Sequence, residues 1–112
     1  MKRYIGECTP DGCQVVVLDS SKPNASYLLN PRYDLRNHSP DGFSFGYNGS
    51  GSAQLSLALL ADALGDTDRA QDMYQSFKFK VIGRLTGDKF ELTEDDIRQK
   101  VAELEAETGR KR

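Results

Sequence analysis

The sequence has no apolar run close to the roughly 20 residues that a membrane-spanning helix needs, and no apolar stretch follows the basic residues near its start. It also has no excess of one charge, because 15 Lys and Arg stand against 17 Asp and Glu, a formal net charge of −2. A membrane protein and a basic nucleic-acid-binding protein are therefore not expected. With 38% hydrophobic and 29% charged residues, the 112 residues are typical of a single globular domain, 1–112, in the cytoplasm.

Cysteine and histidine are scarce, and this limits metal chemistry. The chain has two cysteines, Cys8 and Cys13, and one histidine, His38. A structural zinc site usually takes four ligands, so we expect no metal and no cofactor. The Pro-Asp-Gly between the cysteines is typical of a tight turn, which places the two thiols on either side of a hairpin tip. There the cysteines could approach disulfide distance, but because cytosolic thiols are kept reduced, we favour two small apolar side chains over a disulfide, and the redox state of the pair stays open.

The N-terminal part of the chain predicts β-structure. A hairpin is expected over 2–18, because the β-branched run 15–18 follows the turn. A short third strand is expected at 27–29, between the turn-forming residues 19–26 and Pro31. Two strands alone are marginal in water, so a third strand or a covering helix is required.

The segment 30–51 has neither the period of a helix nor that of a strand, yet it contains several large apolar side chains. These are Tyr33, Leu35, Phe43, Phe45 and Tyr47. A segment this aromatic is not typical of a disordered linker, and long loops inside compact domains are usually functional or contain a missed element. We expect an ordered loop with a short strand at 42–47.

Three helices are expected in the C-terminal part, at about 52–65, 67–85 and 94–108. The first is an alanine- and leucine-rich run that ends at Gly65 and should be largely buried. The third begins after Thr93, an N-cap residue that is followed by carboxylates in the first turn.

The second helix should begin at a cap formed by Asp66 or Thr67, and its apolar residues recur every three or four positions. Leu59 and Phe77 are expected in the core, and 110–112 form a basic tail. The fold class predicted is α+β, with a small antiparallel N-terminal hairpin or three-stranded sheet packed against three C-terminal helices.

Known catalytic motifs do not fit the glycine-rich segment before the first helix. Gly46 and Gly51 have the spacing of a phosphate-binding loop, but Ser52 stands where that motif needs lysine. Ser50 or Ser52 could pair with His38 as a nucleophile and base, but no orienting acid is evident. The sequence does not decide whether the protein is an enzyme, but it favours a protein without catalytic activity.

The strongest candidate site is the loop 48–52, which runs directly into the first helix. The first N–H groups of a helix have no intrahelical partner and lie at the positive end of its dipole, so they accept anions. Two glycines let a ligand approach the backbone closely, and Arg32, Arg36 and His38 supply complementary charge if the loop folds back. The candidate ligand-binding residues are Arg36, His38, Tyr47, Asn48, Gly49, Ser50, Gly51 and Ser52.

Each of these features also has a structural interpretation. Ser50 or Ser52 can cap the helix while the glycines only form the turn, and His38 can tether the loop. The basic residues Lys78, Lys80 and Arg84, together with Lys89, are typical of a solvated face. The acidic residues 94–96 are typical of a helix start rather than of a metal site.

A longer pattern runs from His38-Ser-Pro-x-Gly42-Phe43 through Gly46-Tyr47-x-Gly49-Ser-Gly51-x-Ala53-Gln54-Leu55. It resembles a small uncharacterised domain-of-unknown-function family of bacteria, archaea and their phages, and the similarity covers about residues 30–97 in patches. The chain departs from that pattern at Phe45, Asn48 and Ser52, where the family usually has tryptophan, glycine and proline. The resemblance implies no established activity, but it implies an accessory role of a phage or mobile element acting on host defence.

Two functional hypotheses follow. The first is a small non-enzymatic binding protein that acts on a protein partner or sequesters an anionic, nucleotide-like ligand at the Gly/Ser loop. The second is a small enzyme that acts on phosphoryl or acyl groups with a Ser/His site in the same loop. The absence of an assembled acid, base, metal site or nucleophile in the sequence pattern favours the first.

Overall fold

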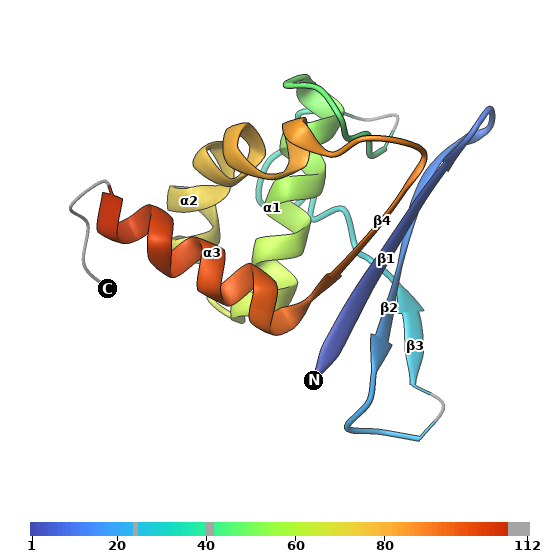
Figure 1. The fold of residues 1–112 in the computed structure, drawn as a ribbon, viewed down its shortest axis with the longest axis horizontal. Helices are drawn as coiled ribbons and strands as arrows, with labels where there is room; N and C mark the ends of the chain where they lie inside the picture. Colours follow the sequence, from blue (N-terminus) through green and yellow to red (C-terminus); the bar gives the residue numbers. More distant parts are fainter. Residues whose placement is uncertain (24, 40–41, 108–112) are drawn as a thin grey trace.

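The computed structural model describes residues 1–23, 25–39 and 42–107, and it confirms the α+β class. A hairpin of β1 (Lys2–Thr9) and β2 (Gly12–Asp19) is followed by the short strand β3 (Ser26–Leu28). After a long loop come α1 (Ser50–Leu64), α2 (Thr67–Lys80), the 3-10 turn η1 (Ile82–Arg84), β4 (Lys89–Thr93) and α3 (Glu94–Glu107). Figure 1 shows the helices gathered on one side of the sheet.

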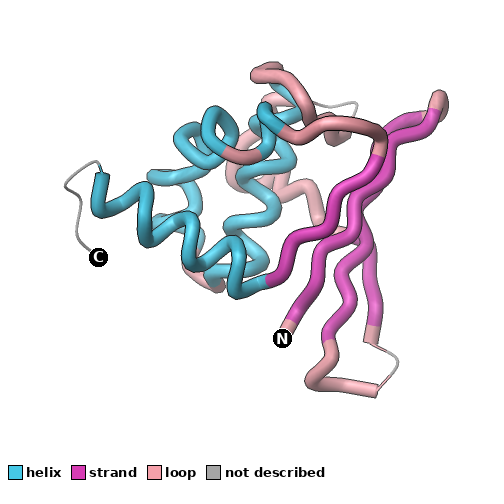
Figure 2. The backbone as a smooth tube through the Cα atoms, viewed as in Figure 1, coloured by secondary structure: helices cyan, strands magenta, loops and turns pink. Residues whose placement is uncertain are grey.

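The sheet has four antiparallel strands in the order β3-β2-β1-β4. Strand β4 was not expected, because 89–93 lies directly before a helix cap and has little strand signal of its own. Its residues pair with β1, and Leu92 lies opposite Tyr4. The strand therefore depends on a partner that is far away in the sequence. Figure 2 shows β4 leading straight into α3.

The helix ends follow the local signals closely. Gly65 closes α1 with a φ of 65°, and Asp66 caps α2 by accepting a hydrogen bond from the Arg69 N–H at 3.0 Å. Thr93 Oγ1 accepts from the Asp96 N–H, and Asp96 Oδ2 accepts from the Thr93 N–H, both at 3.0 Å, which forms a capping box.

The expected second helix, 67–85, is too long. Helix α2 ends at Lys80, and Val81 leaves the helical conformation with φ −125° and ψ −66°. The chain then forms η1, where the Ile82 carbonyl accepts a hydrogen bond from the Gly46 N–H at 2.9 Å. The helix therefore stops where the long loop packs against it. Residue 108 and the basic tail 110–112 lie outside the described residues.

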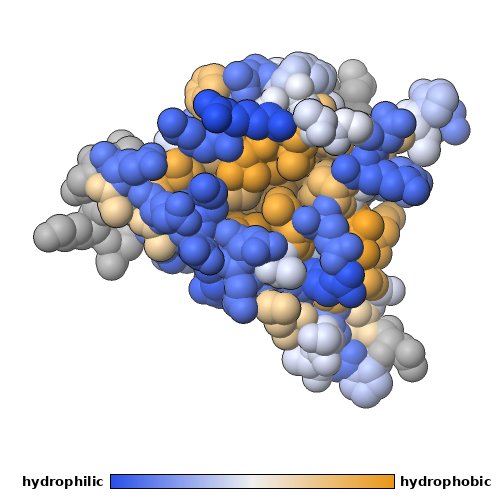
Figure 3. Space-filling model, in the orientation of Figure 1, coloured by the Kyte–Doolittle hydropathy of each residue, from blue (hydrophilic) through white to orange (hydrophobic). Residues whose placement is uncertain are grey.

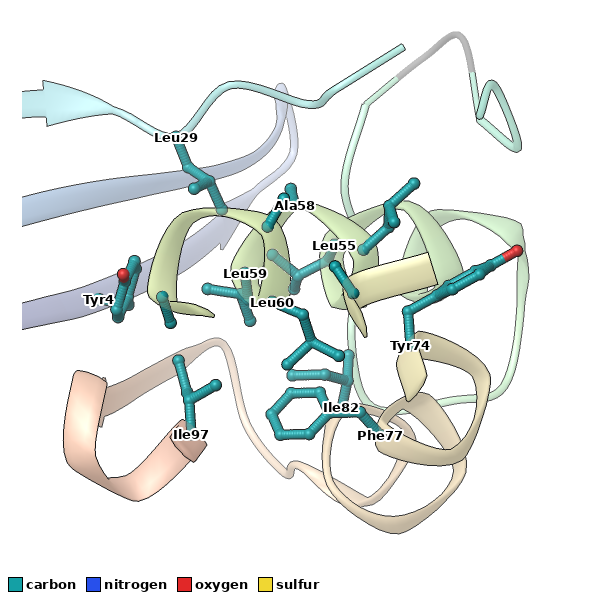
Figure 4. Packing of buried hydrophobic residues seen from close by; sticks show 14 of the residues in the cluster. Tyr4, Leu29, Leu55, Ala58, Leu59, Leu60, Tyr74, Phe77, Ile82 and Ile97 are labelled. Atoms are coloured by element: carbon teal, nitrogen blue, oxygen red, sulfur yellow. The ribbon is translucent and has the colours of Figure 1, made fainter. Parts of the chain in front are cut away.

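Helix α1 is the centre of the molecule. Its residues from Gly51 to Ala61 are all buried, and the sheet, α2 and α3 supply the apolar side chains around it. Figure 4 shows Tyr4, Phe77 and Ile97 approaching it from three different elements. Leu59 and Phe77 are both buried, as expected. None of the helices formed by the described residues is long and apolar enough to cross a membrane.

Cys8 and Cys13 face each other beside the hairpin tip. The Cys8 N–H points to the opposite side of β1, where it donates to the Asp88 carbonyl at 2.8 Å. The two cysteines are therefore a non-hydrogen-bonded pair, the kind in which opposing Cα atoms come closest. Their Cα atoms are 3.9 Å apart and the sulfur atoms are joined in a disulfide, so the expectation of two separate thiols is wrong. The hairpin register is the reason.

The expected strand at 42–47 is also wrong. Among the described residues of that segment, only Phe43 forms a β-bridge, and its partner is Cys13. Phe45 is buried instead and packs edge-on against Phe90 of β4, with ring centroids 5.0 Å apart. The segment is therefore held by the packing of Phe45 against Phe90 rather than by a strand ladder.

Candidate functional site

Helix α1 begins without a side-chain cap. Its N-cap residue is Gly49, no side chain accepts a hydrogen bond there, and no acidic residue lies in the first turn. The first helical hydrogen bond is donated by the Ala53 N–H to the Gly49 carbonyl at 3.0 Å. The interpretation in which Ser50 or Ser52 caps the helix is therefore wrong, and the N–H groups of residues 50–52 have no intrahelical acceptor.

The glycines of the loop serve close packing by the chain itself. A Cβ on Gly51 would overlap the side chain of Ser44, and a Cβ on Gly49 would overlap the ring of Tyr47. Neither glycine has a positive φ. Tyr47 and Ser44 are joined by a hydrogen bond, which the Ser44 hydroxyl donates at 3.0 Å. We expected a ligand to approach the backbone of these two glycines. That space is instead filled by the side chains of Ser44 and Tyr47.

The side-chain hydroxyl of Ser52, in the first turn of α1, is a buried polar group. The residue is fully buried, and its Oγ has no hydrogen-bond partner among the described residues. Its neighbour one turn later, Ser56, is satisfied because its hydroxyl donates to the Ser52 carbonyl at 2.8 Å. A buried hydroxyl without a partner costs about 1–3 kcal/mol. Side chains on a helix lean toward its N-terminus, so this hydroxyl lies at the uncapped end.

The segment with Arg36 and His38 is attached to α1 by Gln54, a residue that the sequence analysis did not single out. The Gln54 Nε2 donates to the carbonyls of Pro31 (2.6 Å) and Arg36 (2.9 Å). Its Oε1 accepts from the N–H groups of His38 (2.8 Å) and Ser39 (3.3 Å). All four hydrogen-bonding positions of this buried amide are therefore used. A single glutamine inside an alanine- and leucine-rich run was the available signal.

His38 is a tether in this structure. Its Nε2 lies 2.7 Å from the hydroxyl of Tyr74 on α2, and the two rings are 5.5 Å apart. The Nε2 atom is thus engaged by Tyr74 and not by a serine of the loop. Arg32 is paired with Asp34 at 2.9 Å, while Arg36 is exposed. The structure therefore brings Arg36 and His38 to the second turn of α1, but as parts of a backbone-anchored loop.

The 3-10 turn η1 lies against the loop that leads into α1. The Asn48 side chain lies directly against Gly83 of η1, and Arg84 is the next residue of this turn. The Arg84 guanidinium is oriented by a hydrogen bond from its Nε to the Phe79 carbonyl at 3.2 Å. Tyr47 is 58% exposed on the same loop. Arg84 was expected on a solvated face and is exposed, and no sequence signal links η1 to residues 48–52.

Metal binding finds no support in the side-chain arrangement of the described segments. Within residues 1–23, 25–39 and 42–107, no group of three or more His, Cys, Asp or Glu residues is placed to hold a metal ion. The start of α1 offers backbone N–H groups and a hydroxyl, which are donors suited to an anion.

Comparison with known proteins adds a family but no activity. No curated protein and no solved structure matches the chain significantly. A family model does match, over residues 4–103, and this range runs from β1 into α3. The chain belongs to the family of unknown function DUF6166.

Proposed function

We propose that the protein is a non-enzymatic binding protein that takes up a small anionic, nucleotide-like ligand at the start of α1. The observation that carries the proposal is the first turn of this helix. Among the described residues no side chain caps it, its own residues include no acidic one, and the buried hydroxyl of Ser52 has no hydrogen-bond partner there. An anion at this point would satisfy backbone donors for which the described residues supply no intrahelical acceptor.

The neighbouring groups favour a phosphate-bearing ligand with an aromatic part. The positive end of the helix dipole and the Arg84 guanidinium, which keeps its Nη donors for other partners, both attract an oxyanion. The exposed ring of Tyr47 offers a face on which a base can stack. Together these groups match the two halves of a nucleotide.

The role of His38 supports binding rather than catalysis. The alternative, a small enzyme with a Ser/His site, requires the His38 Nε2 to exchange Tyr74 for Ser50 or Ser52. The backbone of this segment is held by Gln54, which opposes such a movement. A binding protein needs no such rearrangement.

The proposal is tested by calorimetric titration with inorganic phosphate, a nucleoside monophosphate and the uncharged nucleoside. We expect the monophosphate to bind most tightly and the nucleoside least tightly. Ser50→Asp is the decisive variant, because an acidic residue in the first turn stabilises a helix but repels an anion. It should keep or raise the melting temperature while weakening monophosphate binding at least tenfold.

Arg84→Gln should also weaken monophosphate binding at least tenfold, whereas Lys89→Gln serves as the matched control. Lys89 is exposed on β4 and should leave binding unchanged. Absence of binding by the wild type, or equal binding by wild type and Ser50→Asp, would contradict the proposal. Phosphorus NMR detects whether the monophosphate is converted to inorganic phosphate. Such a release would favour the enzyme instead.

A further inference from the structure

We infer that the nucleotide-like ligand is part of a single-stranded nucleic acid, which binds across the start of α1, the end of α2 and η1. We call this surface the basic face. It is defined by four exposed residues, which are Tyr47, Phe79, Lys80 and Arg84. The inference rests on the proposed function, because a phosphate of the strand is the anion at the start of α1.

The loop before α1 and the end of α2 both pack against η1. On the loop, the Gly46 N–H donates to a carbonyl of η1 at 2.9 Å, and the Asn48 side chain lies against Gly83. The end of α2 is joined to the same turn by the hydrogen bond from Arg84 Nε to the Phe79 carbonyl. The two exposed aromatic residues, one on each segment, therefore border one short turn.

The segments that form the basic face contain no acidic residue, although the chain has 17 of them. Residues 42–61 and 73–87 include neither aspartate nor glutamate. Lys78, Lys80 and Arg84 form no ion pair with any described residue, whereas seven other basic residues of the described chain are paired. The overall charge of −2, from which no nucleic-acid binding was expected, does not show this local excess, which attracts anions.

Hydrophilic side chains cover this part of the molecule, and Figure 3 shows them over the end of α2 and over η1. Among them Phe79 is 50% exposed. Its ring is held by Lys78, a buried residue whose Nζ lies 4.3 Å from the ring centroid. A cation over an aromatic ring is a favourable contact, so the ring is oriented before any ligand arrives. An oriented, half-exposed ring is a surface on which an unpaired base can stack.

The combination of aromatic rings and unpaired cations favours a single strand over other anionic partners. In a duplex the bases stack on one another, so they offer no free face to the rings. An acidic peptide would pair with the cations but would leave both rings without a partner. A membrane surface would take up the rings, but the ammonium held over Phe79 would then enter apolar surroundings, which is unfavourable.

In the resulting arrangement one phosphate of the strand lies at the start of α1. Neighbouring phosphates contact Lys80 and Arg84, while bases stack on the rings of Tyr47 and Phe79. Stacking uses the faces of the bases and not their edges, so binding should depend little on the base sequence.

Calorimetric titration of the full chain with nucleotides of different length tests the inference. The probes are thymidine monophosphate, a 5′-phosphorylated thymidine tetranucleotide, a short DNA duplex and a polyglutamate peptide. We expect the tetranucleotide to bind at least tenfold more tightly than each of the other three. Sedimentation with phosphatidylserine-containing vesicles should leave the protein in the supernatant.

Phe79→Leu is the informative variant for stacking, because it keeps an apolar side chain at this half-exposed position but removes the ring. It should weaken tetranucleotide binding at least fivefold and leave monophosphate binding unchanged. Circular dichroism checks that the variant keeps the fold.

Lys80→Gln tests the contact with the phosphates. It should lower the slope of log affinity against log salt concentration by about 0.7, the value for one phosphate of a single strand. Lys22→Gln is the matched control, because Lys22 is also exposed and forms no ion pair with a described residue, but it lies in the turn after β2. Its salt slope should equal that of the wild type.

The possible failures are distinguishable. Equal affinities for the monophosphate and the tetranucleotide would overturn the inference and leave the proposed function standing, whereas absence of binding to both would overturn both. Equal binding of the duplex or of polyglutamate would indicate a general attraction for polyanions, and preferred binding to vesicles would make a membrane the partner. Either result would overturn the inference, as would wild-type affinity in Phe79→Leu.

Discussion

The hydroxyl of Tyr4 on β1 donates a hydrogen bond to Oδ1 of Asp62 on α1, at 2.5 Å. Tyr27 of β3 donates to the other oxygen, Oδ2, at 2.8 Å, and the Lys2 ammonium lies 3.1 Å from Oδ1. One carboxylate thus joins two strands of the sheet to the central helix. Tyr4 is fully buried, so its hydroxyl has no access to water as a substitute partner.

This contact predicts a loss of stability at alkaline pH. Burial, and then the hydrogen bond to the Asp62 carboxylate, raise the pKa of Tyr4 above its ordinary value of about 10. The pKa of Tyr27 is raised for the same reasons. Below pH 10 the contribution of these two groups to the free energy of unfolding is fully present. Above pH 10 the unfolded chain loses phenolic protons that the folded protein keeps, so this contribution falls as the pH rises further.

Tyr4→Phe should therefore cost about 1.5–3 kcal/mol at neutral pH, the range for a hydrogen bond to a charged group. It should also flatten the alkaline part of the stability profile. Urea unfolding between pH 7 and 11 measures both effects. Tyr27→Phe is the comparison, because Tyr27 shares the carboxylate but is 41% exposed, and its effect should be smaller. An unchanged alkaline slope in Tyr4→Phe would contradict the assignment.

Gln54→Leu should release the 31–39 loop from α1. The substitution keeps the apolar volume but leaves the N–H groups of His38 and Ser39 without their acceptor, at a cost of about 1–3 kcal/mol. Amide hydrogen exchange of these two residues should become faster while the strands stay protected. Gln75→Leu, at an exposed position on α2, is the control, and equal exchange in both variants would contradict the tether.

Leu59→Ala and Phe77→Ala should each cost about 2–5 kcal/mol, because a fully buried side chain loses its transfer energy and leaves a cavity. Leu28→Ala provides the contrast, since Leu28 is 63% exposed and its truncation should change stability by less than about 0.5 kcal/mol. Chemical denaturation of the three variants measures the difference. Similar values for all three would show that the core is placed wrongly.

Gly51→Ala should destabilise the protein by about 1–3 kcal/mol, because the added methyl group overlaps Ser44. Ser44→Gly removes the overlapping side chain, so the double variant should recover part of the loss. A double-mutant cycle from thermal unfolding gives this coupling energy. Strictly additive effects would mean that Ser44 does not contact Gly51 as described.

Much of the local architecture was predictable from short stretches of the chain. The hairpin over 2–18 follows from a Pro-Asp-Gly turn and the β-branched run after it, and the starts of α2 and α3 follow from the capping residues Asp66 and Thr93. Gly65 ends α1 as expected. Each of these signals acts within a few residues, where backbone sterics and single hydrogen bonds decide the outcome.

The surroundings of the start of α1 could be predicted only in part. Residues 48 and 49 do lead into an uncapped helix, but α1 begins at Ser50, so residues 50–52 form its first turn and not a loop. The sequence also could not show that Ser44 and Tyr47 fill the space beside the glycines. It could not place Gly83 against Asn48, because those residues meet only after α2 stops and the chain turns at η1.

What the sequence determined by itself is therefore the set of turns, caps and apolar faces. The tertiary structure alone decided the pairing of β4 with β1, the Gln54 tether and the Tyr4–Asp62 contact. These features join elements through a common packed core or a strand register, and their strength depends on burial. Burial is a property of the whole folded arrangement, so it cannot be derived from any short stretch of the sequence.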